Sequence, residues 1–254
     1  MNSRGMMLAA ALAVGTAVFG GDAERNDSAA MNPSAYRAER SVEGGVKVLF
    51  LGNSITLHGP AAGIGWTNCW GMAASSAERD YAHIVTRGIE KELGRKADVR
   101  IRNIADFERG WQTWKPAEQL AGDLAFKPDY LIVAIGENTS DHDLNGFGAA
   151  FERVLAAFCG PDGKIVPKTV VRGVFWPNAA KDAVLSAAAG KVGAKFVRTD
   201  FRDEPGMIAG TKLFSHPGVA AHPGDAGMAR TASCILTAFF PKADALPAAE
   251  KPVR

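Results

Sequence analysis

Five short apolar runs recur along the chain and alternate with longer segments of helical periodicity. They cover residues 46–52, 97–105, 128–136, 168–176 and 194–200. Strands that alternate with helices pair in parallel, because each helix returns the chain to the same end of the sheet. The sequence therefore predicts an α/β fold of three layers, α/β/α, in which helices cover both faces of a mostly parallel, five-stranded sheet.

The segments between these runs carry apolar residues at helical spacing. In residues 75–94, Ser75 and Glu78 form a candidate capping box and Gly94 is a candidate C-cap. Further helices are expected over residues 116–126, 146–159, 179–193 and 224–240. The regular alternation predicts one domain over residues 46–241.

The two ends of the chain differ in composition from this domain. Arg4 precedes an apolar, Ala-rich stretch of about 14 residues, which is the pattern of a secretory signal peptide. A membrane anchor is the alternative, but a spanning helix needs about 20 apolar residues. We expect a signal peptide over 1–23, a polar linker or leader over 24–45 and a flexible tail over 242–254. The protein is then secreted or periplasmic, without stable membrane insertion after cleavage.

Charge and metal-ligand spacing exclude several kinds of partner. The chain has 29 Lys and Arg against 27 Asp and Glu, without a basic run, so we expect no nucleic-acid partner. Cys69, Cys159 and Cys234 contain no CxxC pair, allow at most one disulfide, and are expected to be small buried side chains. The five histidines share no metal-ligand spacing, so we expect no metal and no other cofactor.

Three polar blocks lie at the ends of predicted strands or before a helix, where open α/β sheets form their sites. Ser54 follows the first run in GNSIT, Asn138 follows the third in GENTSD, and His222 precedes the last helix in HPGD. In this order the blocks resemble those of the SGNH hydrolases, the GDSL esterase and lipase superfamily. The resemblance spans nearly the whole predicted domain and implies a flavodoxin-like fold and an ester-hydrolysing site.

The residue types in these blocks suit acyl transfer. A serine hydroxyl becomes nucleophilic when a base takes its proton, and a histidine can do so and later protonate the leaving alcohol. We therefore expect Ser54 as nucleophile and His222 as base. Donors to the developing oxyanion are worth about 3–4 kcal/mol each; the Ser54 N–H is one, and the resemblance implies the Asn138 amide as another. The alternatives are a turn serine, a loop histidine and a turn asparagine.

Two positions depart from the family's pattern. Glu108 stands where the family has the glycine whose N–H completes the oxyanion hole, so its backbone N–H is the expected donor. The family's aspartate three residues before His222 is replaced by valine. Either a main-chain carbonyl holds the His222 Nδ1–H in a Ser-His dyad, which we favour, or Glu137 or Asp141 supplies a carboxylate. A site without activity is the third possibility.

Two tryptophans follow Ser54 closely in the sequence. Tryptophan faces stack on sugar rings as well as filling cores. Trp66 and Trp70 are therefore expected substrate contacts, with a position in the core as the alternative. His58, in the same segment, is expected to be a solvated loop residue rather than a ligand-binding group.

These features together predict an exported serine esterase that hydrolyses small O-acyl esters, O-acetyl groups on carbohydrate in particular. Export and the tryptophan-bearing segment favour a glycan substrate. The sequence contains no evident long apolar lid segment, which argues against a long-chain lipid as substrate. The alternatives are a lysophospholipase or thioesterase of the same fold, and a carbohydrate-binding domain without catalysis.

Overall fold

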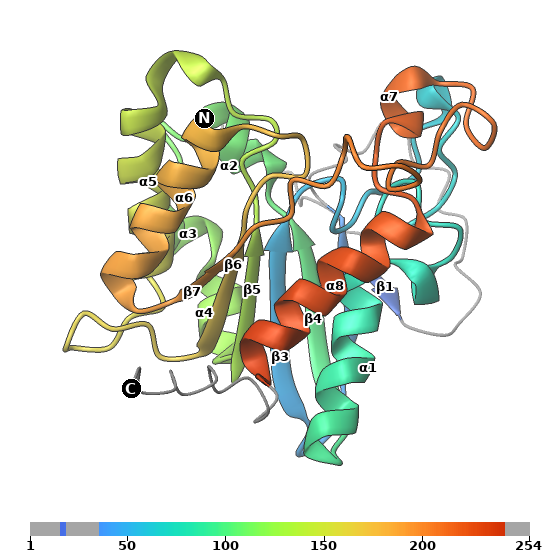
Figure 1. Ribbon diagram of the computed structural model, residues 1–254. Coiled ribbons are helices and arrows are strands. Elements are labelled where there is room, and N and C mark those ends of the chain that lie inside the picture. The colour runs from blue at the N-terminus through green and yellow to red at the C-terminus, as the bar shows by residue number, and fades with distance from the viewer. Residues whose placement is uncertain (1–15, 19–35, 242–254) are drawn as a thin grey trace, which may run out of the picture.

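The computed structural model describes residues 16–18 and 36–241, which contain a seven-stranded sheet of order β1-β2-β4-β3-β5-β6-β7 (Figure 1). Five neighbouring strands are parallel. They are β4 (Ala97–Asn103), β3 (Val46–Gly52), β5 (Tyr130–Ala134), β6 (Lys168–Arg172) and β7 (Lys195–Val197). These are the five strands that the sequence predicts, so the α/β class and the parallel core of the sheet are confirmed.

Two further strands extend the sheet beyond β4. β2 (Arg37–Arg40) pairs antiparallel with β4, and β1 (Thr16–Val18) pairs parallel with β2. β2 lies within residues 24–45, where we expected a linker, because its sequence RAER lacks the apolar run of a central strand. Charged residues are common in strands near the edge of a sheet, where they discourage pairing with other chains.

The expected signal peptide and tail fall mostly outside the described residues. Of residues 1–23 only β1 is described, and the predicted flexible tail over 242–254 is not. Both remain predictions. No helix in the described segments is both long and apolar enough to cross a membrane.

Helices cover both faces of the sheet (Figure 1), which confirms the three predicted layers. α1 (Tyr81–Leu93) and α8 (Asp225–Phe239) pack on one face. On the other face lie α2 (Ala105–Gly110), α4 (Ala121–Phe126), α5 (Leu144–Ala156) and α6 (Ala179–Val192), with α3 (Pro116–Gln119) just before α4. The short α7 (Pro217–Ala220) precedes α8.

Alternate side chains of β3 enter two separate cores. Val48 and Phe50 pack with α1 and α8, whereas Leu49 and Leu51 pack with α5 and α6, and all four are fully buried. Burying each such side chain contributes about 1.5–3 kcal/mol. A strand that is covered on both faces needs an uninterrupted apolar sequence, which is why residues 46–52 predict it so clearly.

Helix α1 begins later than the sequence predicts. Asp80 caps it by accepting a hydrogen bond from the His83 N–H at 2.8 Å. Ser75, the predicted cap, instead donates its N–H to Asp225 Oδ1 at 2.9 Å, at the start of α8. The predicted C-cap, Gly94, is confirmed with a φ of 62°.

The three cysteines form no disulfide within the described part of the chain. All are partly buried, in agreement with small side chains that pack at the edge of the core. Burial raises the pKa of the Cys69 thiol to about 11, so this thiol is protonated near neutral pH.

The carboxyl ends of three strands meet at the centre of the sheet. Gly52, the last residue of β3, lies opposite Asn103 on β4 and Ala134 on β5. A Cβ on Gly52 would lie 1.8 Å from Thr56 Oγ1, so only glycine permits the tight turn that follows. The polar blocks that follow these strands are therefore brought together.

Gly136, just after β5, has a backbone conformation and surroundings that favour glycine. It has a φ of 120°, and an added Cβ would lie 2.9 Å from Val174 Cγ1. Gly136→Ala should therefore lower the free energy of unfolding by about 1–3 kcal/mol, measured by urea denaturation. Gly122→Ala, in an exposed turn of α4 with open space around it, is the matched control and should stabilise by up to about 1 kcal/mol. Equal unfolding midpoints for the two variants would contradict this strain.

Candidate active site

Ser54 lies in the turn that follows β3. The Asn53 carbonyl accepts from the N–H groups of Thr56 (2.9 Å) and Leu57 (3.0 Å), and Asn53 Oδ1 accepts from the Ile55 N–H at 3.1 Å. The turn is thus closed by Asn53, and the next residue, Ser54, lines a pocket. Among the described residues, no group accepts a hydrogen bond from the Ser54 N–H.

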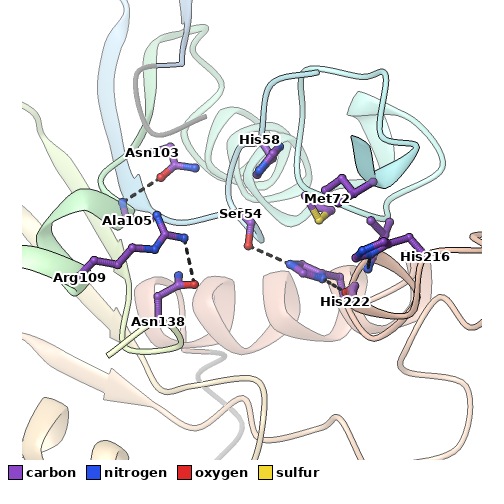
Figure 2. Close-up of a pocket in the computed structure, with 12 residues that line it drawn as sticks. Ser54, His58, Met72, Asn103, Ala105, Arg109, Asn138, His216 and His222 are labelled. Atoms are coloured by element: carbon purple, nitrogen blue, oxygen red, sulfur yellow. Dashed lines mark hydrogen bonds between the residues drawn. The ribbon is translucent and has the colours of Figure 1, made fainter. Parts of the chain in front are cut away.

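His222 lies between α7 and α8 and contacts Ser54 directly. Its backbone carbonyl accepts from the Ala209 N–H at 2.9 Å. Its Nε2 is 2.9 Å from Ser54 Oγ (Figure 2), and its Nδ1 is 2.7 Å from the Gly218 carbonyl oxygen. A carbonyl can only accept, so Nδ1 carries the proton and Nε2 accepts from the serine hydroxyl. This is the geometry that the predicted dyad requires.

The two carboxylates of the alternative triad are engaged elsewhere. Glu137 Oε1 lies 2.8 Å from Arg172 Nη2, and Glu137 Oε2 accepts from Asn53 Nδ2 at 2.7 Å. Asp141 pairs with Lys181 at 3.3 Å. The Gly218 carbonyl therefore takes the position that a carboxylate would hold in a triad.

The surroundings of His222 keep its imidazole neutral. Burial lowers its pKa to about 4, with a smaller lowering by His58, against the raising effect of the hydrogen bond to Gly218. The edge-on ring of Trp176, whose centroid is 5.2 Å from that of His222, packs against it. A neutral imidazole is the form that can take a proton from Ser54.

Asn138 reaches the pocket, but its amide is partly engaged. Asn138 Nδ2 donates to Glu108 Oε2 at 2.6 Å, and Oδ1 accepts from Arg109 Nη2 at 3.3 Å (Figure 2). An amide nitrogen carries two protons, so one remains for the developing oxyanion. The structure therefore brings together Ser54, His222 and Asn138.

The expected role of the Glu108 backbone is wrong. The chain enters helix α2 at Ala105, and helical N–H groups point along the axis to the preceding turn. Ala105 and Arg109 line the pocket from this helix, whereas Glu108 does not. The sequence does not predict α2, because this short helix lacks a long apolar periodicity.

The Glu108 side chain has a different role from its backbone. Its buried carboxylate accepts from the Gly136 N–H (2.5 Å) and Asn53 Nδ2 (3.1 Å), as well as from Asn138. Burial and then the charge of Glu137 raise its pKa, against these hydrogen bonds, which favour the ionised form. Glu108 thus holds the amide of Asn138 and the turn before Ser54.

The expected substrate contacts of Trp66 and Trp70 are also wrong. Trp66 is fully buried, packs edge-on against Trp70 with ring centroids 6.0 Å apart, and donates to the His58 carbonyl at 3.0 Å. Trp70 donates to the Ala74 carbonyl at 2.9 Å. Neither lines the pocket. The alternative, tryptophan as packing residue, is the correct interpretation.

The pocket beside Ser54 has a volume of about 280 Å³, and its lining includes residues that the sequence does not predict there. His58 lines it rather than being solvated, and burial lowers its pKa. Arg109 and His216 also line it, and His216 Nδ1 accepts from the Val219 N–H at 3.4 Å to cap α7. Both had a signal in the sequence: His216 begins a second His-Pro pair, and Arg109 adjoins a family block.

No cluster of metal-ligating side chains forms here or elsewhere in the described residues.

No family model matches the sequence, and no curated protein matches it. Among solved structures, the chain is similar to TesA at 16% identity, with a TM-score of 0.47 and coverage of 77% of this chain and 98% of that one. It is also similar to a two-domain esterase (CEX) active on acetylated mannans. The identity is 21% and the TM-score 0.45, and the match covers 76% of this chain and 48% of that one. An extracellular lipase from Streptomyces rimosus matches at 12% identity with a TM-score of 0.44, and the match covers 76% of this chain and 98% of that one. At these TM-scores the likenesses carry no argument about activity.

The lowered pKa of His222 predicts a pH-dependent stability. Between pH 6.5 and about 4 the unfolded chain takes up a proton at this residue while the folded chain does not. The free energy of unfolding is therefore unaffected by protonation of His222 above pH 6.5, and it falls as the pH drops towards 4. The difference in free energy of unfolding between the native chain and His222→Gln, from urea denaturation, should decrease across this window. A constant difference would contradict the burial of a neutral imidazole.

Proposed function

We propose that this protein is a serine esterase that hydrolyses small O-acyl esters by a Ser-His dyad. The observation that carries the proposal is the contact of Ser54 Oγ with His222 Nε2 at 2.9 Å, with the opposite nitrogen held by the Gly218 carbonyl. The SGNH resemblance of the blocks around Ser54, Asn138 and His222 supports it.

The mechanism follows from this arrangement. Ser54 Oγ attacks the ester carbonyl carbon while its proton passes to His222 Nε2. The oxyanion accepts from the Ser54 N–H and from the remaining Asn138 Nδ2 proton. His222 then protonates the leaving alcohol, and water releases the acid by the same steps, with the imidazole again as base. Gly218 keeps the proton on Nδ1 throughout, so that Nε2 faces the reaction.

The size of the pocket favours a short acyl group. Its volume of about 280 Å³ lies below the range of about 300–1,000 Å³ typical of sites for larger ligands. Its lining includes Asn103, Asn138, His58 and His216, which suits a hydroxylated leaving group. We propose an acetyl ester of a carbohydrate as substrate, and an exported protein on the basis of the N-terminal sequence pattern. A lysophospholipase or thioesterase would need room for a long acyl chain.

Ser54→Ala should lower the hydrolysis of p-nitrophenyl acetate by about a thousandfold or more, because no other nucleophile replaces the hydroxyl. The matched control is Ser233→Ala, on an exposed position of α8, which should leave the rate unchanged. Turnover that survives in Ser54→Ala would remove Ser54 as nucleophile. Glycan binding without any turnover by the native chain would favour the carbohydrate-binding alternative.

Acyl-chain preference tests the substrate class. The value of kcat/KM for p-nitrophenyl acetate should exceed that for p-nitrophenyl palmitate by about tenfold or more, because the pocket cannot enclose a long chain. Both esters share the leaving group, so the comparison isolates the acyl part. A clear preference for palmitate would support a lipase or thioesterase instead.

A further inference from the structure

Among the described residues, the lining of the pocket beside Ser54 includes a cationic side chain and no anionic one. Arg109 lines it together with three imidazoles, and no carboxylate lines it within the described part of the chain. The two acidic residues of α2, the helix that carries Arg109, are engaged in other contacts. Glu108 accepts from Asn138 and from backbone N–H groups, and Asp106 accepts from Trp114 Nε1 at 3.1 Å.

Arg109 is free to bind a ligand. Its side chain is exposed, and Nη2 donates to Asn138 Oδ1 at 3.3 Å. No acidic side chain of the described residues forms an ion pair with it, whereas the nearby Arg102 is paired with Asp123. A guanidinium has five N–H donors. Most of those on Arg109 therefore remain available.

Figure 2 places Arg109 opposite the base. Arg109 and Asn138 lie on one side of Ser54, and His222 and His216 lie on the other. A small ester bound at Ser54 is therefore flanked by the guanidinium within the same pocket of about 280 Å³. The planar fork of a guanidinium matches a carboxylate in shape and charge.

We propose that Arg109 binds a carboxylate of the substrate, so that the preferred esters are acylated acidic compounds such as sugar acids. This inference rests on the proposed esterase function and names its substrate class. Arg109 is then a specificity-determining residue that lowers KM for anionic esters more than for neutral ones.

Matched probes that differ only in charge test this inference by kinetics. The anions 3- and 4-acetoxybenzoate are compared with their neutral methyl esters. Arg109→Gln should raise KM for at least one anion about five- to tenfold more than it raises KM for the matching neutral ester, because an exposed pairing is of moderate strength. Arg109→Lys should retain part of the preference, and added salt should weaken it in the native chain. Arg153→Gln, an exposed arginine on α5, is the control and should have no effect.

Binding gives a readout that does not depend on turnover. Calorimetry with Ser54→Ala should detect tighter binding of the preferred anion than of its methyl ester, and the double variant with Arg109→Gln should lose that difference. Equal binding of anion and methyl ester would overturn the inference, even if Ser54-dependent hydrolysis is present. An equal loss of activity towards charged and neutral esters in Arg109→Gln would also overturn it, because Arg109 would then act on the oxyanion. Failure of the esterase function itself would appear separately, as hydrolysis that does not depend on Ser54.

Discussion

The side-chain amide of Asn53 donates to two buried carboxylates, Glu108 at 3.1 Å and Glu137 at 2.7 Å, and the site is built around this contact. Glu137 also pairs with the fully buried Arg172 of β6. The Arg172 guanidinium thus pairs with Glu137, whereas hydrogen bonds have to satisfy the carboxylate of Glu108 in the interior. The contact ties the turn after β3 to α2, to the loop after β5 and to β6.

The position of the pocket follows from this polar cluster. Ser54 comes directly after Asn53, so the hydrogen bonds of the amide set where the hydroxyl lies. Glu108 also holds Asn138 and the Gly136 N–H. The proposed nucleophile and oxyanion donor are therefore held by two buried side chains, those of Asn53 and Glu108.

His222 is oriented by a carbonyl and therefore lacks the charge that an aspartate would provide. The Gly218 oxygen selects the useful tautomer as well as a carboxylate would, because both accept from Nδ1. It stabilises a protonated imidazole less, however, since it carries only a partial charge. This difference fits the low pKa of about 4, which burial causes.

The sequence by itself determined the order of strands and helices, because strand and helix periodicities are local and a strand buried on both faces has to be apolar. Parallel strands also predict that Ser54 and Asn138 lie at one edge of the sheet, and the resemblance of the blocks predicts that His222 joins them. Only the tertiary structure decided which groups bind them. The Gly218 carbonyl holds His222, the Glu108 side chain holds Asn138, and Trp66 lies in the core, and no motif names these partners. Side-chain partners depend on contacts between residues far apart in the sequence, such as the 168 positions that separate Ser54 and His222, and local patterns do not record them.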